Sequence, residues 1–122
     1  MTDLLIPIVS TIKYEISLFR KLINSKQPYY SVYILTLILK HFAEFILLNE
    51  LKTQARAFSY LQLLKEKNII SKEEEEFINV CVTLVRRKDK LVKEYKTVDV
   101  EKMEKIVRRI ENIILSSASD IS

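Results

Sequence analysis

The sequence predicts an all-α protein, a four- to five-helix up-and-down bundle that contains two long antiparallel helices. Apolar residues recur every three or four positions along the chain, and no segment shows the strict alternation that marks a strand. None of the 122 residues is glycine, which tight hairpins between strands prefer. Hydrophobic residues make up 48% of the chain, so we expect one helical domain with its own core over residues 1–122.

The first two predicted helices are separated by a short break. The first covers about residues 3–24, and the chain breaks between Asn24 and Pro28. The second covers about residues 29–52 and is apolar nearly all round, which predicts burial on more than one side. One small subunit rarely covers such a helix completely, so part of its surface is expected to form a homodimer interface. The apolar stripe of the first helix consists of Leu5, Ile8, Val9, Ile12, Ile16, Phe19, Leu22 and Ile23.

The apolar run at residues 29–48 is long enough to span a bilayer. However, Lys40, His41 and Glu44 lie in its later half, where ionisable groups are costly in lipid. We therefore expect a buried central helix and no membrane association. The chain begins without the basic region and cleavage site of a secretory signal, so the expected location is the cytoplasm.

Three further helices are predicted, over about residues 54–67, 72–95 and 100–118. Ser71 and Glu74 have the spacing of a capping box, and Asp99 suits the N-cap of the last helix. The apolar stripe of the helix over 54–67 consists of Ala57, Phe58, Leu61 and Leu64. That of the helix over 72–95 consists of Phe77, Val80, Cys81, Leu84, Leu91 and Tyr95. That of the helix over 100–118 consists of Val100, Met103, Ile106, Val107, Ile110, Ile113 and Ile114.

The composition excludes most kinds of catalytic site. Without glycine the chain has no Gly-rich phosphate loop and no dinucleotide fingerprint. Its one cysteine, Cys81, forms no disulfide within the chain and is expected in the core. Consecutive carboxylates at Glu73–Glu76 point in different directions on a helix, so they predict a helix start rather than a metal site. The one histidine, His41, is expected to be structural, and we expect no metal and no cofactor.

Positive charge is concentrated in residues 86–96. This segment holds six basic and two acidic residues, so its net charge equals the +4 of the whole chain. Such a segment is either a phosphate-binding surface or a solvated helix face. Lys88 interrupts the apolar stripe of its helix, where a lysine either extends to solvent or marks a cleft.

Residues 88–95 read Lys-Asp-Lys-Leu-Val-Lys-Glu-Tyr. This stretch resembles the signature of the HepT-like branch of the HEPN superfamily, approximately Arg-Asn-x-Leu-Val-His-x-Tyr, and the order of predicted helices fits over about residues 30–118. The resemblance implies a dimeric helical bundle with metal-independent ribonuclease activity, in which an arginine and a histidine from two subunits meet in a cleft. It also implies a nucleotidyltransferase partner that acts as antitoxin and modifies the tyrosine matching Tyr95.

The chain departs from this family at the two residues that carry the chemistry. Lys93 occupies the histidine position, and Lys88 or the adjacent Arg87 occupies the arginine position. An ordinary lysine has a pKa of about 10.4, so a lysine is a poor base at neutral pH. The resemblance therefore implies a catalytically degenerate toxin-antitoxin-type protein. It would bind RNA, a nucleotide or a nucleotidyltransferase partner and would not act as an enzyme.

Two alternatives stay open. One is an active metal-independent ribonuclease that uses lysines, since crowded cations lower the pKa of a lysine. The other is a purely structural dimerising helical protein. For the binding function we expect Arg87, Lys88, Lys90 and Lys93 to hold phosphate, with Asp89 in the same cleft. Lys88 of one copy would approach Lys93 of the other, in a dimer built from the second and fourth helices.

Overall fold

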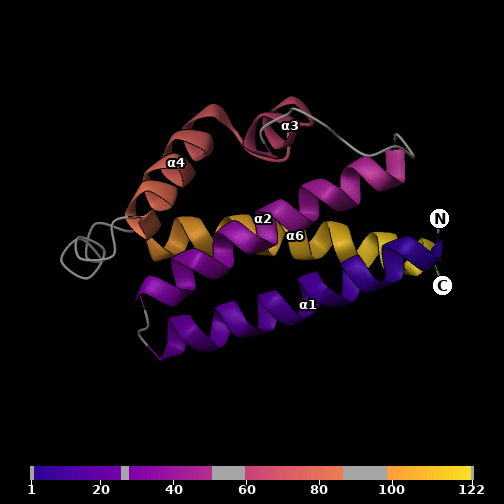
Figure 1. Ribbon diagram of the computed structural model, residues 1–122, viewed down its shortest axis with the longest axis horizontal. Helices are drawn as coiled ribbons and strands as arrows, with labels where there is room; N and C mark the ends of the chain where they lie inside the picture. Colours follow the sequence, from indigo (N-terminus) through magenta and orange to yellow (C-terminus); the bar gives the residue numbers. More distant parts are fainter. Residues whose placement is uncertain (1, 26–27, 51–59, 87–98, 122) are drawn as a thin grey trace.

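The computed structural model describes residues 2–25, 28–50, 60–86 and 99–121. Within these residues the chain forms helices and no strand, as the sequence predicts. The helices are α1 (Thr2–Asn24), α2 (Pro28–Glu50), α3 (Tyr60–Glu66), α4 (Lys72–Arg86) and α6 (Val100–Ile121) (Figure 1). The predicted bounds of the two long N-terminal helices are confirmed within two residues where the chain is described. The predicted helical residues 54–59 and 87–95 lie outside the described residues.

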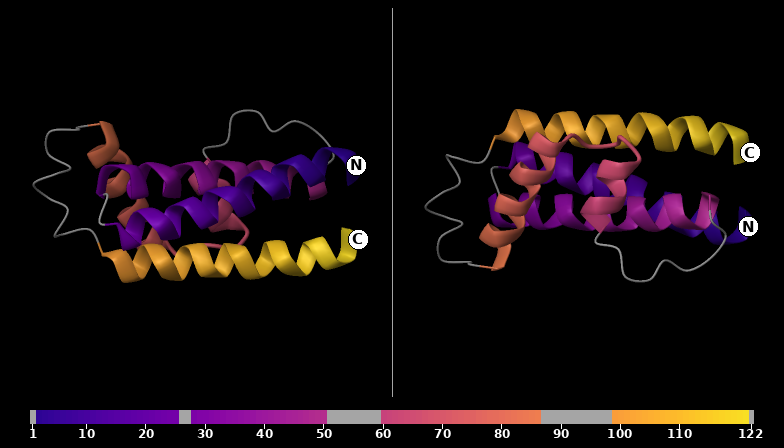
Figure 2. Two further views of the ribbon diagram at one scale, coloured as in Figure 1. Left: turned by 90° about the horizontal axis from the view of Figure 1, so that it is seen from below. Right: turned by 90° about the horizontal axis from the view of Figure 1, so that it is seen from above.

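Three long helices set the shape of the molecule. The helices α1 and α2 run antiparallel, and α6 runs beside them in the direction of α2 (Figure 1). Two further views place α1 and α2 in one layer and α6 in another (Figure 2). The antiparallel pair predicted from the sequence is therefore present as α1 and α2.

The short helices α3 and α4 cross the long helices steeply, a feature that the predicted up-and-down order did not include (Figure 2). Since α2 and α6 run the same way, the chain between them must return along the bundle before α6 begins. Both short helices pack against α2 during this return.

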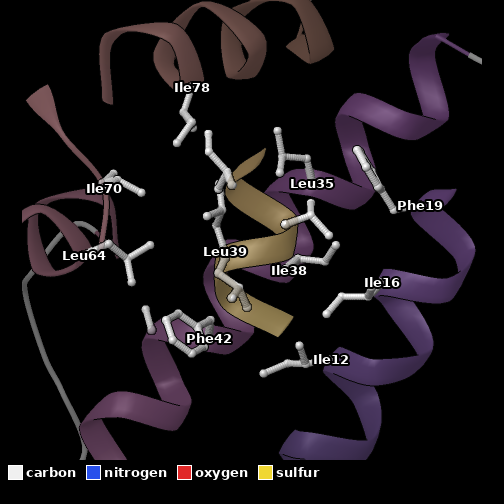
Figure 3. Packing of buried hydrophobic residues seen from close by; sticks show 14 of the residues in the cluster. Ile12, Ile16, Phe19, Leu35, Ile38, Leu39, Phe42, Leu64, Ile70 and Ile78 are labelled. Atoms are coloured by element: carbon white, nitrogen blue, oxygen red, sulfur yellow. The ribbon is translucent and has the colours of Figure 1, made fainter. Parts of the chain in front are cut away.

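The core is centred on α2, which packs against each of the other four described helices. Its residues Leu35, Ile38, Leu39 and Phe42 are completely buried, beside Phe19 of α1 and residues of α3 and α4 (Figure 3). This position explains why α2 is apolar nearly all round, as a helix covered on several sides must be. The buried stripe of α6 matches the prediction and consists of Met103, Ile106, Val107, Ile110 and Ile114.

The face that α4 buries differs from the predicted stripe. Val80 was expected in the core but is 58% exposed, whereas Ile78 is completely buried beside Cys81. Periodicity alone allowed either face, because α4 carries apolar residues on both. Contact with α2 selects the face that contains Ile78.

Local hydrogen bonds fix where the helices begin and end. The N–H of Ser71 donates to Oε1 of Glu74 at 2.9 Å, and the N–H of Glu74 donates to Oγ of Ser71 at 3.0 Å. This is the predicted capping box. The N–H of Lys102 donates to Oδ1 of Asp99 at 3.1 Å, which confirms the N-cap of α6. After α3, Asn68 adopts φ of 61°, a left-handed conformation that glycine usually supplies at helix ends.

Within the described part of the chain, one helix is long and apolar enough to cross a membrane, by length and composition alone. It is α2, over Tyr30–Leu48, and 67% of this stretch is buried inside the structure. The core helix of a soluble protein meets the same criterion. The packing of α2 against four helices accounts for its composition without a bilayer.

Candidate functional site

The basic segment 86–96 joins the end of α4 to the beginning of α6. All predicted site residues lie outside the described residues, namely Arg87, Lys88, Asp89, Lys90, Lys93 and Tyr95.

The described residues on either side of this segment lie at one end of the bundle. The last turn of α4 and the first turn of α6 are both at the end where α1 leads into α2 (Figures 1 and 2). Lys21 is exposed in the last turn of α1 at this end. In the first turn of α6, Nζ of Lys102 lies 5.6 Å from the centre of the Phe77 ring. The two described helices that flank the basic segment therefore approach it from the same end of the bundle (Figures 1 and 2).

His41 pairs with a buried carboxylate between α1 and α2. Its Nδ1 lies 2.8 Å from Oε1 of Glu15, whose side chain is only 8% exposed. This contact confirms the expectation that His41 is structural, and it supplies a partner that the sequence analysis missed. The sequence pattern does place Glu15 on the apolar stripe of α1, because it is three residues after Ile12 and four before Phe19.

Arg109 joins α6 to the turn that precedes α4. Its Nη1 donates to Oε1 of Glu74 and to the carbonyl of Ile69, both at 2.7 Å, and its Nη2 donates to Oε2 of Glu74 at 3.1 Å. Burial raises the pKa of Glu74, but the hydrogen bonds from Arg109 and from the Ser71 backbone outweigh it and lower the pKa overall. Glu74 therefore caps α4 and anchors α6 at the same time.

Arg20 joins α1 to α6 in the same manner. It donates to both carboxylate oxygens of Glu111, at 2.7 and 2.8 Å, and to Glu104 at 3.4 Å. The hydrogen bonds from Arg20 lower the pKa of Glu111. These arginines serve the packing of helices and are occupied by carboxylates, so they are poor candidates for binding an external anion.

The structure places Cys81 in the core, as predicted, and burial raises the pKa of its thiol to about 11. A thiol with such a pKa is a weak nucleophile at neutral pH. Among the residues that the structure describes, no group of three or more histidine, cysteine or acidic side chains is placed to hold a metal ion.

His41, Arg109 and Arg20 thus have structural partners within the described residues. Comparison with known proteins adds no identification: no protein-family model, no curated protein and no solved structure matches this chain.

Proposed function

We propose that this protein is a catalytically degenerate relative of the HepT-like branch of the HEPN superfamily, and that it binds RNA phosphates through the basic segment 86–96. The observation that carries the proposal is the sequence of residues 88–95, which keeps the Leu-Val spacing and Tyr95 of the family but has Lys93 where the histidine belongs. The all-α architecture is consistent with the small helical bundle that the resemblance implies.

The distribution of charge supports an anionic ligand. The segment carries the whole net charge of +4, whereas Arg20 on α1 and Arg109 on α6 are paired with glutamates. Clustered lysines and arginines attract phosphates and release counterions when they bind. Arg87, Lys88, Lys90 and Lys93 are the proposed phosphate ligands.

The proposal includes a dimeric, cytoplasmic protein with a small nucleotidyltransferase as a second partner. In the family that partner acts on the tyrosine two residues after the histidine, and Tyr95 stands two residues after Lys93. The protein itself does not hydrolyse RNA, because a lysine with an ordinary pKa of about 10.4 does not exchange protons readily at neutral pH.

The test uses the purified full chain and a fluorescent single-stranded RNA in the presence of EDTA. We expect reversible binding and intact RNA, and we expect the Lys88→Glu, Lys93→Glu variant to bind at least tenfold more weakly. The matched control is the Lys13→Glu, Lys72→Glu variant, which makes the same change of charge at exposed residues of α1 and α4. If both variants lost the same amount of affinity for RNA, binding would depend on the net charge of the protein and not on the basic segment.

Two outcomes would select the alternatives. Cleavage of the RNA in EDTA by the parent, lost in Lys93→Ala, would establish a ribonuclease that uses lysines. Absence of binding at low salt would leave a structural dimerising protein and contradict the proposed function.

A further inference from the structure

Near its beginning, α2 exposes aromatic side chains and buries small polar ones. Tyr30 is 56% exposed and Tyr33 is 42% exposed, whereas Ser31 and Thr36 are buried. This is the reverse of the usual order, because serine and threonine are mostly found at protein surfaces and tyrosine has a large apolar ring. The order of residues here therefore calls for an explanation other than burial of apolar area.

The packing of the core does not require the two tyrosine rings. In the same turns of α2, Val32 and Leu35 are completely buried and supply contacts with the core. The hydroxyl of Thr36 donates to the carbonyl of Tyr33 at 2.6 Å, so its own helix satisfies this buried hydroxyl. We therefore look for a role of Tyr30 and Tyr33 at the surface of the protein.

The position of these tyrosines in the bundle indicates that role. Tyr30 and Tyr33 are three residues apart on one side of α2, which places their Cβ atoms about 5–6 Å from each other. At a rise of about 1.5 Å per residue, both lie within about 8 Å of the beginning of the helix along its axis. The last turn of α4 and the first turn of α6, which flank the basic segment 86–96, are at the same end of the bundle (Figure 1).

An unpaired RNA strand is recognised by two kinds of side chain. Lysines and arginines hold its phosphates, and aromatic rings stack on its bases. In a duplex the bases already stack on one another, so only an unpaired strand offers base faces to a protein ring. Approach of a phosphate backbone to this part of α2 is not opposed by charge, because the helix has no acidic residue before Glu44.

We propose that Tyr30 and Tyr33 form a platform on which unpaired bases of a single-stranded RNA stack, while the basic segment holds the phosphates. The inference rests on the proposed RNA-binding function, to which it adds a preference for single strands over duplexes and two residues outside the basic segment. Because every base has an aromatic face, the platform accepts bases of any identity.

Removal of the rings tests the proposal on the purified full chain. The probes are a single-stranded RNA of about twelve nucleotides, its duplex and an abasic phosphodiester strand of the same length. The parent is expected to bind the single strand more tightly than the duplex. The Tyr30→Ser, Tyr33→Ser variant is expected to bind the single strand about tenfold more weakly and the abasic strand as the parent does, because it loses rings but no charge. The Tyr30→Phe, Tyr33→Phe variant keeps the rings and is expected to bind the single strand like the parent.

The matched control is Tyr14→Ser, which removes a ring that is 67% exposed in the middle of α1 and is expected to leave RNA binding unchanged. Circular dichroism verifies that each variant is folded.

Three results would overturn the platform: a folded Tyr30→Ser, Tyr33→Ser variant that binds the single strand as tightly as the parent, an equal loss of affinity for the abasic strand, or an equal loss in Tyr14→Ser. The proposed function would still hold if Lys88→Glu, Lys93→Glu weakened RNA binding in the same assay. A parent that does not bind RNA at low salt would overturn both.

Discussion

At the scale of single residues, several side chains behave as the sequence predicts, but their long-range partners were not predicted. The Ser71–Glu74 capping box is local, so four residues of sequence were enough to predict it. The second partner of Glu74 is Arg109, which is 35 residues away. No spacing rule connects them, because the contact depends on how α6 packs beside the turn before α4.

The ion pairs predict how stability changes with pH. The pKa values of Glu74 and Glu111 are lowered in the folded protein, the first because arginine and backbone hydrogen bonds outweigh burial and the second because of Arg20. A carboxylate with a lowered pKa stabilises the fold above its ordinary pKa of about 4.5, and this stabilisation is lost as the pH falls through the lowered value. We therefore expect the free energy of unfolding to decrease as the pH falls below about 5.

Urea denaturation across this pH range measures the effect, and Arg109→Met isolates the contribution of Glu74. In this variant the carboxylate no longer has its arginine, so the decrease on acidification is expected to be smaller than in the parent. If the free energy of unfolding decreased equally with falling pH in both proteins, the assigned role of the Glu74–Arg109 pair would be contradicted.

At the scale of helices, the positions of the helices could be predicted from the sequence more accurately than the faces that they bury. Amphipathic periodicity identified α1 and α6 together with their buried stripes, because only one side of each is strongly apolar. In α4 the apolar residues are spread over two sides, and the exposure of Val80 was not predicted. Periodicity specifies an apolar face only where the opposite face is polar.

Arg109 connects α6 to the carbonyl of Ile69 as well as to Glu74, so its substitution tests how much this connection between helices stabilises the fold. Arg109→Met keeps an aliphatic chain but removes these hydrogen bonds and leaves a half-buried carboxylate without its partner. We expect the free energy of unfolding to fall by about 1.5–3 kcal/mol. The adjacent Arg108 is exposed, so Arg108→Met is the control and is expected to change stability by less than about 0.5 kcal/mol. Equal effects of the two substitutions in urea denaturation would show that the connection is not important for stability.

At the scale of the whole molecule, the all-α class and the central position of α2 were predictable, whereas the path of the chain was not. The absence of glycine and the continuous helical periodicity were sufficient to predict the all-α class. Neither the steep crossing of α3 and α4 nor the common direction of α2 and α6 was predicted (Figure 2). That direction is set by contacts between helices distant in the sequence, which local patterns do not encode.

Charged residues are distributed unevenly along the chain. Arg20, Arg109 and the buried Glu15 have partners within the described helices, and the excess of positive charge lies in residues 86–96. The candidate site was accessible from sequence because charge clustering and motif spacing are local properties. Whether Lys88 of one copy meets Lys93 of another depends on a dimer and stays a prediction.

The most direct test of this account is the salt dependence of RNA binding by the purified full chain. If the four cations Arg87, Lys88, Lys90 and Lys93 contact phosphates, the logarithm of the binding constant for single-stranded RNA falls with the logarithm of salt concentration with a slope of about −3. In the Lys88→Glu, Lys93→Glu variant we expect a slope reduced by about half, while the Lys13→Glu, Lys72→Glu control keeps the slope of the parent. A slope that is the same in all three proteins would contradict the claim that the basic segment is the RNA-binding site.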